Sequence, residues 1–177
     1  MNNLILVRHG QSLWNQQRRF TGWADVDLTE HGRLEAKYAG QLIKELNIKF
    51  DAYFTSVQKR AISTLEIILD ILNKQESHIK KAWELNERHY GALTGLNKDE
   101  MVKKHGNNQV HIWRRSFDIP PPPMKKTDPN HPSHNTAYTT IPVDKIPSGE
   151  SLKNTFERVI PYYKENIEPL ISSNKNI

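Results

Sequence analysis

Cysteine is absent from the 177 residues, so the chain can form neither a disulfide framework nor a thiolate metal site. Its apolar runs are short, and none approaches the roughly 18 residues that a membrane-spanning helix needs. No basic segment followed by an apolar stretch opens the sequence, which predicts no secretory signal. These absences favour a globular protein of the reducing cytoplasm.

Acidic residues are outnumbered by basic ones, and the formal net charge is +5. A net positive charge favours binding to anionic partners. Proteins that bind nucleic acid usually gather Lys and Arg into one stripe, whereas the basic pairs of this chain are dispersed and interrupted by acidic residues. We therefore expect phosphorylated small molecules as partners, and neither nucleic acid nor a membrane.

Two short apolar runs are typical of buried parallel strands. The first spans residues 4–7 and ends at Arg8-His9-Gly10, and the second is Ala52–Thr55. Segments with helical spacing of apolar residues follow both runs. The alternation of strands and helices predicts an α/β fold with a mostly parallel sheet.

Capping residues set the expected helix limits. Thr29 begins one helix, which ends at Asn47, and Ser56 caps the next. Asn97 is expected to cap a helix over 98–104 that stops at Gly106, and a short helix is expected near Val110.

A late helix is expected over residues 150–171, kinked or interrupted by Pro161 and Pro169. Before it, residues 118–147 hold eight of the ten prolines. Proline lacks a backbone N–H donor, so this segment predicts an irregular insertion, either a lid or a binding element.

Arg8 and His9 stand at the carboxyl end of the first expected strand, where ligand chemistry collects in open α/β sheets. A neutral imidazole is a competent nucleophile near neutral pH, because its unperturbed pKa is about 6.5. Phosphoryl transfer needs neutralisation of the transferring oxygens, which the arginine fork provides. The alternative is an ordinary histidine at a strand end.

Further candidates follow at later positions. Arg60 lies one turn into the helix after the second strand and can reach back across the sheet, although it can equally be a solvated arginine. Glu87 can act as a general acid and base for a substrate hydroxyl, or belong to a surface turn. Lys98 and the Arg114-Arg115 pair are candidate clamps for a carboxylate or a second phosphate. The histidines show no metal-binding spacing, and we expect no metal.

The sequence closely resembles the 2,3-bisphosphoglycerate-dependent phosphoglycerate mutases of the histidine phosphatase superfamily. The resemblance covers nearly the whole chain. Its motifs are Leu6-Val7-Arg8-His9-Gly10-Gln11-Ser12, Phe20-Thr21-Gly22-Trp23, Thr55-Ser56-Val57-x-Lys59-Arg60-Ala61, Asn86-Glu87-Arg88-His89-Tyr90-Gly91, Gly95-Leu96-Asn97-Lys98, Trp113-Arg114-Arg115 and Glu150-Ser151-Leu152. The block around Glu87 is specific for the mutase branch.

The resemblance implies a role for each matching residue. His9 would carry the phosphoryl group, Glu87 would be the acid and base, and Arg8 and Arg60 would complete the catalytic set. The substrate-binding residues would be Ser12, Asn15, Thr21, Gly22, Arg88, His89, Tyr90, Lys98, Arg114 and Arg115. Asn15 would help Arg8 and Arg60 to hold the transferring phosphoryl group.

The family interconverts 2-phosphoglycerate and 3-phosphoglycerate in glycolysis and gluconeogenesis, primed by 2,3-bisphosphoglycerate and without a metal. Its fold is a three-layer α/β arrangement with a mostly parallel sheet and flanking helices. The resemblance thus implies one cytoplasmic, mutase-like domain over residues 1–177, with the Pro-rich insertion at 118–147 and assembly as a dimer or tetramer.

The chain departs from the family at its end. Family members continue beyond a segment like 172–177 into a further strand with a second histidine, and His105-Gly106-Asn107 does not replace that histidine. A missing strand would leave backbone groups unpaired, so we expect an incomplete domain with weak or no mutase turnover. Two alternatives stay open: a phosphatase of the same superfamily acting on phosphate monoesters, and a non-catalytic remnant that binds anions.

Overall fold

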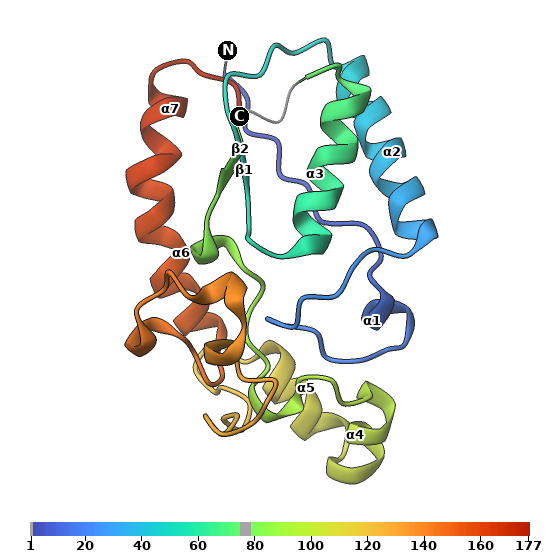
Figure 1. The fold of residues 1–177 in the computed structure, drawn as a ribbon, viewed down its shortest axis with the longest axis vertical. Coiled ribbons are helices and arrows are strands. Elements are labelled where there is room, and N and C mark those ends of the chain that lie inside the picture. Colours follow the sequence, from blue (N-terminus) through green and yellow to red (C-terminus); the bar gives the residue numbers. More distant parts are fainter. Residues whose placement is uncertain (1, 75–78) are drawn as a thin grey trace. The chain divides into compact units, whose positions relative to one another are not determined.

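The computed structural model describes residues 2–74 and 79–177 and places them in two compact units (Figure 1). Unit 1 takes its residues from Met1–Leu13, Val26–Leu85 and Val159–Ile177, and unit 2 from Trp14–Asp25 and Asn86–Arg158. The helices are α1 (Leu13–Gln16), α2 (Glu30–Glu45), α3 (Lys59–Ile71), α4 (Lys98–His105), α5 (Asn107–Arg115), α6 (Leu152–Asn166) and α7 (Glu168–Ser172). The single-turn helices are η2 (Trp83–Leu85), η3 (Gly91–Leu93), η4 (Pro132–His134), η5 (Thr136–Tyr138) and η6 (Val143–Lys145).

Unit 1 is built around a parallel pair of strands, β1 (Tyr53–Thr55) and β2 (Ile79–Lys81). Tyr53 pairs with Ile79 and Thr55 with Lys81. In Figure 1 this pair lies between α3 on one side and the red end of the chain on the other, where Phe54 of β1 meets Tyr162 of α6 with ring centroids 6.4 Å apart. Helices therefore flank a parallel sheet, which confirms the predicted α/β class.

Helix α2 packs closely against its neighbours in unit 1 because its buried positions are small residues. Gly32, Ala36 and Gly40 recur every four residues along α2 and are its buried positions. A Cβ on Gly40 would lie 3.1 Å from the Cβ of Ile71 on α3, so the side chain has no room there. The larger apolar residues of α2, such as Leu34 and Tyr38, are instead exposed.

The N-terminal segment differs from the prediction of a buried strand. Residues 2–10 form no strand, and the side chain of Leu6 is 85% exposed. Two backbone hydrogen bonds reach this segment from Ile177, which accepts from Ile5 N at 2.8 Å and donates to Asn3 O at 2.9 Å. A buried strand needs pairing along its length and cover on its faces, and within the described residues the segment lacks both.

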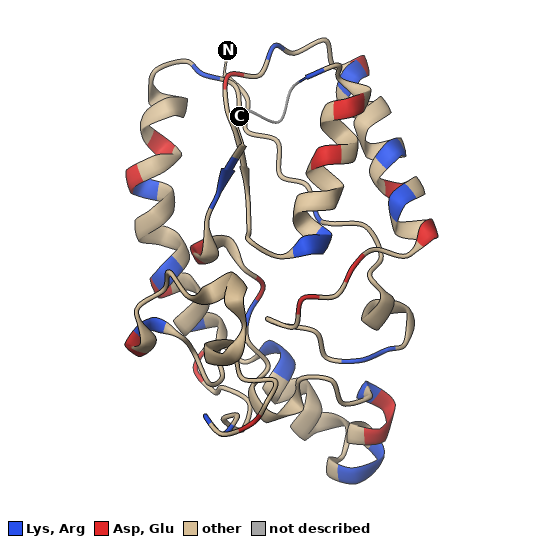
Figure 2. Cartoon of the chain, in the orientation of Figure 1, with Lys and Arg blue, Asp and Glu red and all other residues tan. Residues whose placement is uncertain are grey.

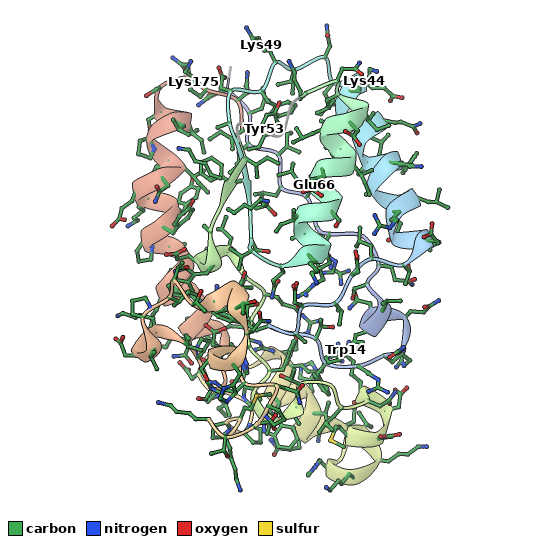
Figure 3. The ribbon with its side chains drawn as sticks, viewed as in Figure 1. Trp14, Lys44, Lys49, Tyr53, Glu66 and Lys175 are labelled. Carbon is green, nitrogen blue, oxygen red and sulfur yellow. The ribbon has the colours of Figure 1, made fainter. Side chains whose placement is uncertain are left out.

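The last residues of the chain are held beside the segment that leads into β1. Lys175 Nζ lies 3.4 Å from Asp51 Oδ1, and the Asn176 backbone N–H donates to Asp51 Oδ2 at 2.9 Å. Asn176 Nδ2 also donates to the carbonyl of Lys49 at 3.0 Å. Lys49, Lys175 and Tyr53 are labelled in Figure 3, where Lys49 and Lys175 lie at the same end of unit 1.

Unit 2 has a core in which Phe20, Leu93, Met101 and Val110 are buried against one another. Phe20 comes from the segment Trp14–Asp25, which packs against α4, α5 and η3 through this cluster. Two chain segments distant in sequence thus share one hydrophobic core.

The Pro-rich segment 118–147 is irregular, as predicted, with η4, η5 and η6 as its regular turns. It nevertheless contributes buried side chains to unit 2, including Met124, His131 and Tyr138. Tyr138 Oη donates to the carbonyl of Trp23 at 3.0 Å, and their ring centroids are 4.8 Å apart. Part of the segment is therefore packed into unit 2, and its role as a lid or binding element stays a prediction.

The predicted caps are confirmed in two helices. Thr29 Oγ1 accepts from Gly32 N at 3.0 Å at the start of α2, and Asn97 Oδ1 accepts from Asp99 N at 2.9 Å at the start of α4. The prediction for Ser56 was wrong: α3 begins at Lys59, and Ser56 Oγ accepts from Gln58 N in the turn before it. That bond stabilises the turn rather than the helix end.

Helix α6 continues through Pro161, whereas α7 begins separately, with Pro169 in its first turn. Proline fits the first turn of a helix because its missing N–H would have no partner there. Among the described residues, no helix combines the length and apolar character that crossing a membrane requires.

Candidate active site

His9 in unit 1 has both ring nitrogens in contact with neighbouring groups. Nδ1 lies 2.6 Å from the carbonyl oxygen of Gly10, and Nε2 accepts a hydrogen bond from Arg60 Nε at 3.2 Å. A carbonyl can only accept, so Nδ1 carries the proton and Nε2 presents its lone pair. The half-buried ring is therefore held in the tautomer in which Nε2 is the nucleophile.

Arg60 is fully buried, with 0% of its surface exposed, at the start of α3. Its Nη2 donates to Gln58 Oε1 at 2.9 Å, and Gln58 is itself buried. The guanidinium is thus fixed beside Nε2 of His9, and a buried cation attracts anions more strongly than an exposed one. The importance of Gln58 could not be predicted from the sequence, because an uncharged residue before a helix carries no specific signal.

The backbone after His9 is anchored by α3 and α2. Gly10 N donates to Thr64 Oγ1 at 3.1 Å, and the same hydroxyl donates to the carbonyl of Arg60 at 2.7 Å. A Cβ on Gly10 would lie 2.1 Å from the carbonyl oxygen of Gly32, so only glycine permits this approach. The role of Thr64 was not predicted, because in the sequence it resembles any other helical threonine.

Two other residues predicted for the site lie close to His9 in sequence. Ser12 is fully buried and forms an isolated bridge with Leu28. Arg8 is exposed. The roles of both residues continue to rest on the family resemblance.

In unit 2, Thr21 and Gly22 lie against the loop that contains Arg88 and Tyr90. Gly22 has φ +55°, and a Cβ there would lie 3.0 Å from Tyr90 N and 3.1 Å from Arg88 O. Thr21 is buried, and its Oγ1 has no hydrogen-bond partner in the structure. A buried hydroxyl without a partner is costly, and a ligand oxygen or N–H would satisfy it.

Arg88 connects this loop to the end of α5. Its Nη2 donates to the carbonyls of Trp113, at 3.1 Å, and of Arg114. Its guanidinium carbon also lies 5.0 Å from the centre of the Tyr90 ring. Arg88 is buried, and its Nη2 holds α5, whereas its Nη1 has no hydrogen-bond partner in the structure and could donate to a ligand.

The predicted cations of unit 2 flank the same core. Lys98 Nζ lies 5.8 Å from the centre of the Phe20 ring, and Phe20 and Tyr90 have centroids 5.2 Å apart. Arg114 is half-buried and Arg115 exposed in the last turn of α5. Asn15, also predicted for the site, lies half-buried on α1.

His89 is buried, with 1% of its surface exposed. Its Nδ1 accepts from Gly91 N at 2.9 Å, and its ring centre lies 6.1 Å from that of Trp23. Burial, and then the charges of His131 and Arg158, lower the pKa of His89 to about 4. These contacts favour packing of a neutral ring over contact with substrate.

Glu87 is half-buried, between the buried residues Asn86 and Arg88. Its role as general acid and base continues to rest on the family resemblance. No group of three or more His, Asp or Glu residues able to hold a metal ion occurs in the part of the chain that the structure describes.

Comparison with known proteins identifies the family. The family model of the histidine phosphatase superfamily (branch 1) matches residues 4–129. The 2,3-bisphosphoglycerate-dependent phosphoglycerate mutase of Hydrogenobaculum sp. (strain Y04AAS1) is 54% identical over 171 residues, which are 97% of this chain and 69% of the relative. The enzyme of the same name from Pelagibacter ubique (strain HTCC1062) is 52% identical over 177 residues, which are 100% of this chain and 74% of the relative.

Solved structures show the same fold. A phosphoglycerate mutase from Bacillus anthracis str. Sterne has a TM-score of 0.70 at 21% identity, with 99% of this chain and 72% of that chain covered. A mycobacterial glucosyl-3-phosphoglycerate phosphatase has a TM-score of 0.71 at 20% identity, with 99% and 73% covered. The chain therefore belongs to the histidine phosphatase superfamily and, within it, to the 2,3-bisphosphoglycerate-dependent phosphoglycerate mutases.

Proposed function

We propose that this chain interconverts 2-phosphoglycerate and 3-phosphoglycerate through a phosphoryl group carried on His9 and primed by 2,3-bisphosphoglycerate. Membership of the family makes the chain an enzyme of glycolysis, an isomerase that moves a phosphoryl group. The names of both relatives include dependence on 2,3-bisphosphoglycerate, which supports the same primer here.

The observation that carries the proposal is the environment of His9. Gly10 O holds the proton on Nδ1, and the buried guanidinium of Arg60 lies beside Nε2. A phosphoryl group that approaches Nε2 would meet the donor fork of Arg60, which can neutralise its oxygens. Positioning and neutralisation are most of what phosphoryl transfer requires.

The proposed transfer has two halves. In the first, the Nε2 lone pair of His9 attacks phosphorus and the N–P bond forms. The P–O bond to the substrate breaks, and the Glu87 carboxyl protonates the leaving hydroxyl oxygen. In the second, the Glu87 carboxylate takes the proton from a substrate hydroxyl, whose oxygen attacks phosphorus and releases His9. Atoms and charge balance over the cycle, because each half reverses the other on a different hydroxyl.

The groups of unit 2 have the chemistry to bind small phosphorylated acids. Lys98, Arg114 and Arg115 supply cations, and the buried Oγ1 of Thr21 has a free hydrogen-bonding capacity. These groups suit 2,3-bisphosphoglycerate, a small polyanion. Along helices such as α2 and α4 basic and acidic residues are mixed, which supports small anions over nucleic acid (Figure 2).

We also propose that residues 1–177 belong to one mutase-like domain that includes the segment 118–147. Support comes from the family match over residues 4–129, which draws on both unit 1 and unit 2.

Labelling with 2,3-bisphosphoglycerate that carries radioactive phosphorus tests the proposal. The purified chain should acquire an acid-labile label and show at least weak conversion of 2-phosphoglycerate to 3-phosphoglycerate, and His9→Asn should lose both. His111→Asn, an exposed histidine on α5, should keep both. Label on His111 or another residue would contradict the role of His9.

The outcome also separates the alternatives. Release of inorganic phosphate from several monoesters at a rate above that of isomerisation would indicate a phosphatase. Binding of 2,3-bisphosphoglycerate without label or turnover would indicate a non-catalytic anion-binding protein.

Assembly and location are further proposals: a cytoplasmic dimer or tetramer. The absence of cysteine suits a reducing compartment. The exposed apolar residues Leu34, Tyr38 and Leu42, spaced by four along α2, supply a surface for self-association. Light scattering should give a mass of at least two chains, and Leu34→Glu should reduce it; a monomeric mass for the unsubstituted chain would contradict assembly.

A further inference from the structure

A buried ion pair in unit 2 joins Glu150, two residues before α6, to Arg158 in the second turn of that helix. Arg158 Nε lies 2.7 Å from Glu150 Oε1, and Arg158 Nη2 donates to Glu150 Oε2 at 2.9 Å. The two side chains are 9% and 4% exposed. The pair is therefore a bidentate contact shielded from water.

Both partners also bind the backbone of the loop 86–89. Arg158 Nη2 donates to the carbonyls of Asn86, at 3.0 Å, and Glu87, at 3.2 Å. Glu150 Oε2 accepts from His89 N at 2.8 Å, and Glu150 N donates to His89 O at 2.9 Å. The ion pair thus holds the chain immediately before and after the side chain of Glu87.

Stability alone does not account for this arrangement. Two charges taken out of water lose much of their hydration, and a well-packed apolar pair of similar size often gives equal or greater stability. Apolar side chains cannot, however, bind two carbonyls and an amide N–H of the same loop. The hydrogen bonds to backbone are what the ion pair adds.

We propose that Glu150 and Arg158 are positioning residues that set the position of the Glu87 carboxyl for proton transfer. The inference rests on the proposed function, in which Glu87 protonates the leaving hydroxyl. Proton transfer requires hydrogen-bond geometry, and a displacement of about 1 Å can cost 100-fold in rate. A rigid backbone on both sides of Glu87 maintains that geometry.

The test compares two substrates that differ in their need for a proton. When phosphoglycerate gives up its phosphoryl group, the leaving oxygen is that of an alcohol and must be protonated by a general acid. When 4-nitrophenyl phosphate does so, the leaving group is 4-nitrophenolate, which needs no proton. Arg158→Gln and Glu150→Ala should lower kcat with 2-phosphoglycerate by about 10-fold or more. In the same variants, KM for 2-phosphoglycerate should change by less than about threefold. The rate of phosphoryl transfer from 4-nitrophenyl phosphate to His9 should also change by less than about threefold.

Control variants separate positioning from general damage. Asp99→Asn removes the exposed Arg18–Asp99 ion pair of the same unit and should leave all rates unchanged. Glu150→Gln keeps an oxygen that can accept from His89 N and should recover part of the loss. Because the Glu150–Arg158 ion pair (the clamp) acts through Glu87, Arg158→Gln combined with Glu87→Gln should be no slower than Glu87→Gln alone.

Hydrogen exchange provides a readout independent of turnover. In Glu150→Ala the amide of His89 should exchange faster, while amides of α4 and α5 keep their rates. The inference would be overturned if the variants lost rate equally with both substrates, or if their rates did not change. Faster hydrogen exchange throughout unit 2 would overturn it as well. If the unsubstituted chain forms no phosphorylated His9, the proposed function fails, and the exchange at His89 still tests whether the clamp holds the loop.

Discussion

Arg60 Nε donates to His9 Nε2 across 3.2 Å, from a guanidinium that is completely buried. Because the bond requires a lone pair on Nε2, it is compatible with a neutral ring protonated on Nδ1, where the carbonyl of Gly10 accepts. The same pair of residues therefore supplies a nucleophilic nitrogen and a cation for the group it attacks.

Replacement of Arg60 by lysine should separate charge from geometry. Arg60→Lys keeps the charge but cannot reach both Gln58 and His9 with a planar fork. We expect phosphorylation of His9 to slow by about 10- to 100-fold, as for the loss of one aligned donor at a transition state. Rapid-quench labelling measures this rate, with Arg33→Lys as the control at a more exposed ion pair of unit 1. An unchanged rate would show that charge alone suffices.

Thr64→Val should reveal how the backbone after His9 is held. The change keeps the shape of the side chain but removes the hydroxyl that accepts from Gly10 N and donates to Arg60 O. An N–H left buried without a partner should lower the free energy of unfolding by about 1–3 kcal/mol. Urea denaturation measures it, and Ser63→Ala on the same helix should stay within about 0.5 kcal/mol of the unsubstituted chain. Equal effects of both substitutions would argue against the anchor.

Gly22→Ala should impair substrate binding. The added Cβ would lie 3.0 Å from Tyr90 N, at a φ of +55°, and would displace the loop that carries Tyr90. We expect KM for phosphoglycerate to rise by about 10-fold or more, because the binding groups would shift. Gly106→Ala is the matched control: its φ is +81°, yet a Cβ there meets nothing within 4 Å. It should lower stability through backbone strain and leave KM unchanged, whereas a similar KM for both variants would contradict the prediction.

The buried His89 should make stability depend on pH. Its pKa is about 4 in the folded chain, chiefly because of burial, and about 6.5 when unfolded. Between these values the unfolded chain takes up a proton that the folded chain does not, so stability is lost as the pH falls. This one group should reduce the free energy of unfolding by about 2 kcal/mol between pH 7 and pH 5.

Urea denaturation at the two pH values measures the effect of His89. His89→Asn offers an oxygen to Gly91 N in place of Nδ1 and does not titrate, so the variant should lack this part of the pH dependence. His111→Asn should retain it, because His111 is exposed. An identical pH dependence in both variants would show that other groups dominate.

Local signals in the sequence predicted much of the secondary structure. Thr29 and Asn97 cap α2 and α4 as expected, because capping depends on residues within one turn. A parallel sheet was also predicted and β1 lies where a strand was expected, although its partner β2 was not predicted. The family motifs, which contain His9, Arg60 and Glu87, are likewise contiguous in the sequence.

Other features depend on contacts between distant residues. An apolar run at residues 4–7 has the pattern of a buried strand, yet Leu6 is exposed because burial depends on what packs against the run. Thr64 acquires its role by meeting Gly10, and Arg158 by meeting Glu150 and the loop at Glu87. The sequence by itself determined the family, the starts of α2 and α4 and the chemistry of the reacting groups. Tertiary structure alone decided which ordinary side chains hold those groups in place, because hydrogen bonds between distant segments leave no periodic or local pattern.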